Sequence, residues 1–212
     1  MSSTSISIIE QLGISKASLA ARGLREYQEA ECLGLAEVGD DKKEHLLVPA
    51  AACAWRKLKH AALDDQILVF IVSGFRSIER QATVIRRKLD SGACIEDIVK
   101  ACAPPGYSEH HAGCAVDVST PGSPLLDVSF AETPAFRWLA SHASSFGFSL
   151  SFPKGNSYGY GYEPWHWRFN ESQPIIPTDR PDGKKAVKKS PHKGKTKGAR
   201  HDNRRAPGKA GA

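Results

Sequence analysis

The stretch SEHHAGCAVD, residues 108–117, places two histidines before a glycine and an aspartate after it. From Cys114 onward the residues alternate as in a β-strand, so Asp117 lies on a predicted strand and His110 lies ahead of it. Gly113 permits a tight turn that would bring these two side chains to one point. Because imidazole and carboxylate groups are common zinc ligands, the stretch predicts part of a metal site at the entry to a strand.

Two further segments carry polar groups of the same kind: SGFRSIERQ at residues 73–81 and YEPWHWR at 162–168. Hydrolytic zinc commonly has three protein ligands and keeps a fourth position for water. Two imidazoles and one carboxylate leave a net positive centre, which lowers the pKa of that water. In a regular strand Glu163 and His166 would point to opposite faces, so Pro164 indicates that a strand begins, or is irregular, at this point.

The flanking sequence predicts an α+β domain with a small antiparallel sheet and flanking helices. ILVFIVSGF, residues 67–75, is a continuous apolar run that predicts a central strand and puts Arg76 just past its end. The other expected strands are 114–119, a short one after Gly147, and WHWRF at 165–169. The expected helices are 49–64, 77–89 with Ser77 as N-cap, 95–102 and 133–146.

Composition divides the chain into three parts. Residues 1–45 carry apolar residues at helical spacing and predict an N-terminal helical extension, residues 46–178 hold the three polar segments and are expected to form one domain, and residues 179–212 are expected to form a basic tail. Residues 184–212 hold eleven Lys or Arg and one acid, a charge of +10, so a formal total of +6 leaves −4 for the rest. With almost no large apolar residues the tail is expected to be disordered. Its clustered cations suit an anionic polymer such as wall polymer, acidic membrane or nucleic acid.

The N-terminus shows no basic segment ahead of an apolar run of signal-peptide length, and no stretch approaches the roughly 20 apolar residues of a membrane span. We therefore expect the chain in the cytoplasm, or released or exported by a non-classical route. Five cysteines, an odd number without CxxC spacing, favour reduced thiols over disulfides or a thiolate metal site.

Taken together, these segments resemble the Ser-x-His-x-x-Gly-x-Ala-x-Asp and Glu-x-Trp-His motifs of VanY-type D-alanyl-D-alanine carboxypeptidases. These enzymes are LAS metallopeptidases, a group that includes VanX dipeptidases and L-alanyl-D-glutamate endolysins. The resemblance covers about residues 47–170 and implies the LAS-type zinc peptidase fold. The resemblance implies that Zn²⁺ is bound by His110, Asp117 and His166, with Glu163 as general base.

The first segment adds substrate contacts by the same resemblance. SGFRS is similar to the family's SGYRS, which makes Arg76 the residue that binds and stabilises carbonyl or carboxylate oxygens of the substrate. Gln81 and Ser108 are then further substrate-binding candidates. Three positions depart from the family pattern: Phe75 where Tyr is common, His111 where Gln is common and Cys114 where Leu is common.

His111 and Cys114 admit other roles. His111 competes with His110 as a ligand, although the Ser-x-His frame selects His110, and a supporting or substrate role for His111 stays open. Cys114 would act as a catalytic thiol only with a histidine and an orienting partner of its own.

The resemblance implies hydrolysis of D-Ala-D-Ala or a related bond in peptidoglycan stem peptides. One alternative keeps the chemistry and changes the bond, as in an L,D-carboxypeptidase or a peptidoglycan endopeptidase. Another is a non-catalytic zinc-containing module that binds wall peptide or a polyanion. Glu163 argues against the last alternative, because binding alone has no need of a general base.

Overall fold

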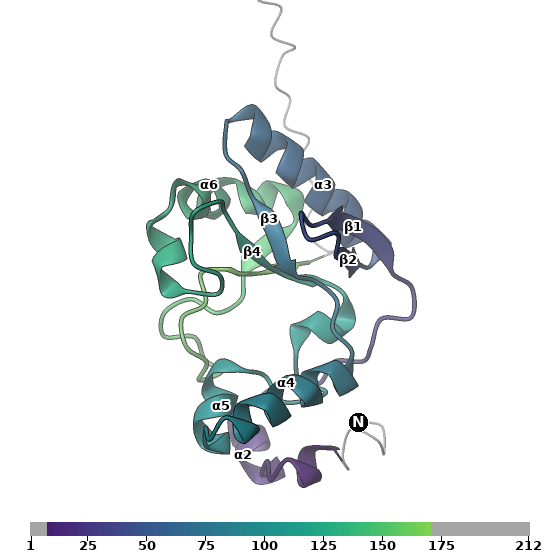
Figure 1. Cartoon of the computed structure of the whole chain (residues 1–212), viewed down its shortest axis with the longest axis vertical. Coiled ribbons are helices and arrows are strands. Elements are labelled where there is room, and N and C mark those ends of the chain that lie inside the picture. The colour runs from purple at the N-terminus through teal and green to yellow at the C-terminus, as the bar shows by residue number, and fades with distance from the viewer. Residues whose placement is uncertain (1–7, 171–212) are drawn as a thin grey trace, which may run out of the picture. The chain divides into compact units, whose positions relative to one another are not determined.

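The computed structural model describes residues 8–170, and its central feature is a four-stranded antiparallel sheet (Figure 1). The strands are ordered β3, β4, β6, β5 and span Phe70–Ser73, Ala115–Ser119, His166–Phe169 and Phe148–Leu150. Each neighbouring pair is antiparallel. The predicted α+β class with a small antiparallel sheet is confirmed. The tail expected to be disordered lies outside the described residues.

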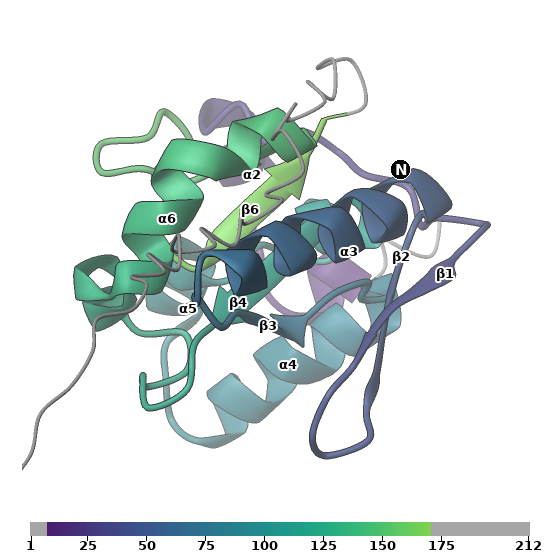
Figure 2. The same ribbon diagram turned by 90° about the horizontal axis from the view of Figure 1, so that it is seen from above.

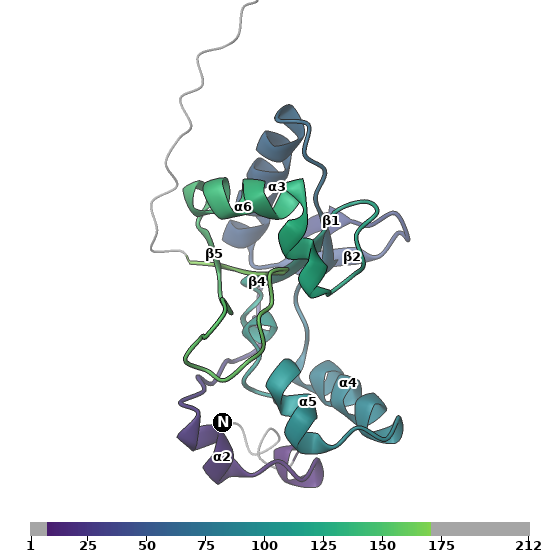
Figure 3. The same ribbon diagram turned by 90° about the vertical axis from the view of Figure 1, so that its left-hand side faces the viewer.

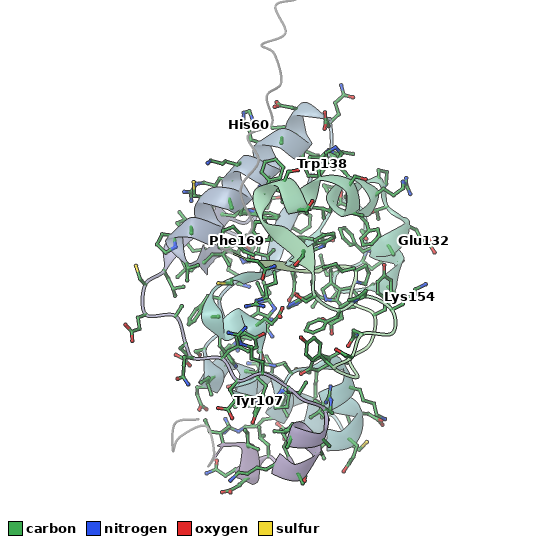
Figure 4. All side chains as sticks on the ribbon, turned by 180° about the vertical axis from the view of Figure 1, so that it is seen from behind. His60, Tyr107, Glu132, Trp138, Lys154 and Phe169 are labelled. Atoms are coloured by element: carbon green, nitrogen blue, oxygen red, sulfur yellow. The ribbon has the colours of Figure 1, made fainter. Side chains whose placement is uncertain are left out.

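Two groups of helices lie at opposite ends of this part of the chain (Figures 1 and 3). α3 (Pro49–Asp64) and α6 (Pro134–His142) share the main core with the sheet, and Figure 2 shows α3 running across it. α2 (Lys16–Ala21), α4 (Ile78–Asp90) and α5 (Ile95–Ala101) enclose a second core with residues 8–14. Among the labelled side chains of Figure 4, Trp138 and Phe169 belong to the first core, whereas Tyr107 packs on the second. Residues 73–81 lead from β3 to α4, and residues 108–117 lead back from the helices of the second core to β4.

The boundaries of the main helices agree with the sequence signals. α3 begins at Pro49, which has no backbone N–H to lose in a first turn, and ends at Asp64. Ser77 caps α4 by accepting a hydrogen bond from the backbone N–H of Arg80 at 3.1 Å. α6 continues into the 3-10 helix η3 (Ala143–Phe146), and Gly147 ends it with a left-handed φ of 80°.

The prediction of a helical extension over residues 1–45 is wrong for its second half, which forms strands. Residues 8–11 and α2 are helical, but β1 (Gly34–Val38) and β2 (Glu44–Leu47) form an antiparallel hairpin. The charged residues 40–43 lie in the hairpin turn, in which Lys42 has a φ of 61°. Tertiary contacts stabilise the hairpin, because Glu37 accepts a hydrogen bond from the indole of Trp55 on α3 at 2.8 Å.

The apolar run at residues 67–75 was predicted as a central strand, but only Phe70–Ser73 is a strand and it lies at the sheet edge. The run is apolar because Val69 and Ile71 enter the main core. Its register with β4 shifts between Ile71 and Ser73, so the ladder ends where the chain turns towards α4. No helix within residues 8–170 is long and apolar enough to cross a membrane.

Candidate metal centre

One row of the sheet brings the predicted ligands together. Asp117 on β4 is the register partner of both Ser73 on β3 and His166 on β6. His110 comes from the 3-10 helix η1 (Glu109–Ala112), which ends at Gly113 in the left-handed conformation, with a φ of 63°. A potential ligand atom from each of His110, Asp117 and His166 lies within 4.8 Å of the others, and all three residues are buried.

Hydrogen bonds determine which imidazole nitrogen of His110 faces this cluster. Its Nδ1 lies 2.7 Å from the carbonyl oxygen of Gly74, which can only accept, so Nδ1 carries the proton. Nε2 lies 3.1 Å from Asp117 Oδ2. The chain approaches closely here: a Cβ on Gly74 would lie 2.8 Å from the carbonyl oxygen of Leu46. Glycine in the SGF sequence therefore allows this segment to pack against the backbone of Leu46 on β2.

His166 faces the cluster with Nδ1, whereas His110 faces it with Nε2. Its Nδ1 lies 2.9 Å from Asp117 Oδ1, whereas Nε2 lies 3.0 Å from Glu109 Oε2. Burial opposes a charge on His166, but hydrogen bonds to these two carboxylates raise its pKa to about 10. Burial also opposes ionisation of Asp117, yet His110 and His166 outweigh it and hold the pKa of Asp117 well below its usual range.

The donor set fits zinc. A buried carboxylate between two imidazoles requires a positive charge nearby, and a metal ion in place of the Nδ1 proton of His166 would supply it. Two nitrogens and one oxygen are a common three-ligand set for catalytic zinc, which leaves a further position open.

Glu163 lies beside the cluster without belonging to it. It precedes β6, and its Oε2 is 3.9 Å from Nδ1 of His166. Burial raises the pKa of Glu163 to about 7, with the nearby Asp117 acting in the same direction. A carboxylate with a pKa near neutrality is suited to take up and return a proton.

Arg76 is held in a defined position. Its Nη2 donates to Ser73 Oγ at 2.7 Å and lies 3.5 Å from Asp117 Oδ2, and its Nη1 donates to Gln81 Oε1 at 2.8 Å. The amide nitrogen of Gln81 donates to the carbonyl oxygen of Ala103 at 2.6 Å. Gln81 is almost fully buried and supports Arg76; its role as a substrate contact stays a prediction.

A cavity of about 650 Å³ contains the site. Its lining includes all three ligand candidates together with Arg76, Glu163 and Ser108. The predicted site residues, scattered over the sequence, are therefore brought together at one cavity. Another wall is formed by α4, where Arg80 and Lys88, eight residues apart, face the same space.

The role of His111, which the sequence leaves open, follows from its contacts. The residue is fully buried and lies outside the ligand cluster. Its Nδ1 is 2.6 Å from the carbonyl oxygen of Arg76, and its Nε2 accepts from the backbone N–H of Gly106 at 3.1 Å. Both nitrogens thus contact backbone, and burial lowers the pKa of His111. His111 therefore supports the segment that carries Arg76.

Glu109 was not among the site residues predicted from the sequence, yet it contacts the site. Its carboxylate contacts His166, and Ser151 Oγ donates to its Oε2 at 2.6 Å. Burial opposes ionisation, but His166, Ser151 and Arg168 together lower the pKa of Glu109. The one signal in the sequence was the position of Glu109 as an acid directly before His110 in the motif. The residues that Glu109 contacts are far away in the sequence and gave no further signal.

Residues 44–172 match the family model VanY: D-alanyl-D-alanine carboxypeptidase. The putative carboxypeptidase YodJ of Bacillus subtilis is 32% identical over 122 residues, which are 56% of this chain and 44% of YodJ. VanXYC of Enterococcus gallinarum, a bifunctional D-Ala-D-Ala dipeptidase and carboxypeptidase, is 30% identical over 69% of this chain and 77% of its own. The chain spans less than half the length of YodJ and of two enterococcal D-alanyl-D-alanine carboxypeptidases.

Solved structures of an LD-carboxypeptidase and of a D,D-pentapeptidase are similar to this chain. The LD-carboxypeptidase LdcB has a TM-score of 0.60 and 30% identity, covering 66% of this chain and 69% of LdcB. A Zn(II) complex of the D,D-pentapeptidase VanY has a TM-score of 0.53 and 26% identity, covering 66% of this chain and 79% of that one. Because the family model matches more than half of its length, this chain belongs to the VanY family of D-alanyl-D-alanine carboxypeptidases, which are zinc metallopeptidases.

Proposed function

We propose that this chain is a zinc-dependent carboxypeptidase that removes the terminal D-alanine from peptidoglycan stem peptides ending in D-Ala-D-Ala. One observation carries the proposal: Glu163, with a pKa of about 7, lies 3.9 Å from a candidate ligand atom in a three-residue metal cluster. A binding module needs the ligands alone, whereas hydrolysis needs a proton acceptor beside them. The non-catalytic alternative is therefore disfavoured.

The metal would be held by His110 Nε2, Asp117 and His166 Nδ1. Zinc bound there supplies Lewis-acid chemistry, which lowers the pKa of water and polarises a carbonyl group. Glu163 accepts the proton of the attacking water and returns it to the leaving amine, because its carboxylate lies beside the ligand cluster without being one of the ligands.

Arg76 binds the oxygens of the substrate. Ser73 and Gln81 hold its guanidinium beside Asp117, so its donors are oriented before substrate arrives. A fixed guanidinium suits either the C-terminal carboxylate or the oxyanion that develops during hydrolysis. On the α4 wall, Arg80 and Lys88 add positive charge, which favours a substrate bearing carboxylates, as stem peptides do.

A second candidate is L,D-carboxypeptidase activity, in which the bond before a single terminal D-alanine is cut. It is favoured by the likeness to LdcB and to DacB, an L,D-carboxypeptidase with a TM-score of 0.51 and 31% identity. Both reactions need the same metal, base and guanidinium, so they differ only in how the cavity holds the residue before the cut.

Defined stem peptides distinguish these activities. Purified protein is incubated with a pentapeptide ending in D-Ala-D-Ala and with the corresponding tetrapeptide ending in one D-Ala, and products are identified by mass spectrometry. The proposal requires loss of one alanine from the pentapeptide alone, inhibition by chelator and recovery with zinc. Loss of alanine from the tetrapeptide supports the second candidate, and an internal cut supports an endopeptidase. An intact pentapeptide in the presence of zinc contradicts the proposal.

A further inference from the structure

A segment outside the family match lies against the metal centre. Residues 24–31 connect α2 to the hairpin, and they precede residue 44, where the match begins. The backbone N–H of Tyr27 donates to the carbonyl oxygen of Gly106 at 2.8 Å, and that of Ala30 donates to the carbonyl oxygen of His111 at 2.8 Å. The segment is therefore attached to the chain on both sides of His110.

Tyr27 connects this segment to the metal centre through Glu109. The phenol hydroxyl of Tyr27 donates to Glu109 Oε1 at 3.3 Å. Glu109 Oε2 accepts from Ser151 Oγ at 2.6 Å and contacts His166 Nε2 at 3.0 Å. Arg168 Nε lies 3.8 Å from Glu109 Oε1, and its guanidinium lies 5.5 Å from the centre of the Tyr27 ring. The carboxylate is thus held by contacts at both of its oxygens.

We propose that Glu109 is a positioning residue for His166, and that Tyr27 and Ser151 hold Glu109 in place. An ionised carboxylate only accepts hydrogen bonds, so its contact keeps a proton on His166 Nε2 and directs Nδ1 to the metal. Carboxylate partners of this kind orient a ligating imidazole and increase its basicity. The segment before the family domain thereby becomes part of the metal centre. This inference rests on the proposed metal ligands.

Zinc affinity measured without substrate tests the inference. Zinc binding is titrated in competition with a chromophoric chelator for wild type, Glu109→Ala, Glu109→Gln and Tyr27→Phe. Loss of such a partner typically weakens metal binding about 10- to 100-fold, which we expect for Glu109→Ala. Glu109→Gln retains a hydrogen-bond acceptor without the charge, so its zinc affinity should lie between those of wild type and Glu109→Ala. Removal of one hydroxyl hydrogen bond by Tyr27→Phe should weaken binding roughly three- to tenfold.

Tyr107→Phe is the matched control. The hydroxyl of Tyr107 also donates to a carboxylate, Glu26 Oε1 at 3.4 Å, but at an exposed position. This variant should bind zinc as tightly as wild type. A second measurement separates positioning from folding: the visible spectrum of the Co²⁺-substituted protein should change in the Glu109 variants, because the imidazole donor changes. The melting temperature in chelator should stay close to that of wild type in Tyr27→Phe.

The outcomes are distinguishable from failure of the proposed function. Suppose that wild type binds zinc tightly, that Tyr27→Phe and Glu109→Gln bind zinc with affinities within twofold of wild type, and that both give the wild-type Co²⁺ spectrum. The inference about Glu109 is then wrong, while the proposed function stands. These two conservative variants decide the matter even if Glu109→Ala fails to fold. If wild type itself binds no zinc, both proposals fall together.

Discussion

Replacing Glu163 with glutamine should abolish most turnover while leaving the metal site intact. Glutamine has nearly the same shape, and Glu163 lies 3.9 Å from His166 Nδ1 without belonging to the ligand cluster, so no metal ligand is removed. An amide does not accept a proton at neutral pH. A general base contributes typically 10² to 10⁴ in rate, so kcat should fall by about that factor with one zinc still bound.

The same substitution should stabilise the metal-free protein at high pH. A carboxyl group whose pKa is about 7 in the folded chain has one of about 4.3 in an unfolded chain. The folded state therefore keeps a proton that the unfolded state loses, and stability declines as pH rises between these values. Above pH 7 the cost is on the order of 3 kcal/mol in chelator, and Glu163→Gln removes it. Near pH 4 both proteins should be equally stable.

Two assays check this reasoning. Urea unfolding in chelator at pH 4 and pH 8 measures the stability difference, and zinc-loaded kinetics measure the rate. Because a nearby metal cation lowers the pKa of a carboxyl group, the acid limb of kcat/KM should lie below about pH 7. Activity of Glu163→Gln within a few-fold of wild type would refute its role as the base. Equal stability of the two metal-free proteins at pH 8 would show that Glu163 is not desolvated as described.

Further predictions concern three other parts of the chain. Arg76→Lys should keep zinc but lose about 10- to 100-fold in kcat/KM, because lysine lacks the planar fork held by Ser73 and Gln81. Equal activity of Arg76→Lys on a carboxylate-ended peptide and on its amide would contradict this role of Arg76. His111→Gln should stay near wild type because glutamine offers both a donor for Arg76 and an acceptor for Gly106, whereas His111→Leu should lose about 1 to 3 kcal/mol in urea unfolding. A chain ending at Gly183 should cleave a small peptide normally yet lose salt-sensitive binding to anionic polymers; loss of peptide cleavage would place the tail within the catalytic domain.

Local sequence signals predicted much of the site's framework. The turn at Gly113, the strand carrying Asp117 and the cap of α4 by Ser77 all depend on residues near one another in the chain. Pro164 correctly indicated that β6 begins beyond Glu163, which leaves Glu163 beside the cluster. These features follow from backbone geometry and alternation, which a single sequence displays.

Features that depend on distant residues were not predictable in the same way. Glu109 meets Ser151 and His166 from 42 and 57 positions away, and no pattern within a window reports such contacts. The hairpin of β1 and β2 was missed because its stability comes from packing on α3, as the contact between Glu37 and Trp55 illustrates. In both cases tertiary structure gave a role to residues whose local sequence was ambiguous.

The zinc ligands, with Glu163 beside them and not among them, are tested most directly by the zinc content of purified His166→Ala, measured beside wild type and Glu163→Gln. We expect one zinc per chain in wild type and in Glu163→Gln, and a large loss of zinc in His166→Ala, because His166 contributes a ligand atom to the buried cluster and Glu163 does not. An unchanged zinc content in His166→Ala, with the protein folded, would show that His166 is not a zinc ligand.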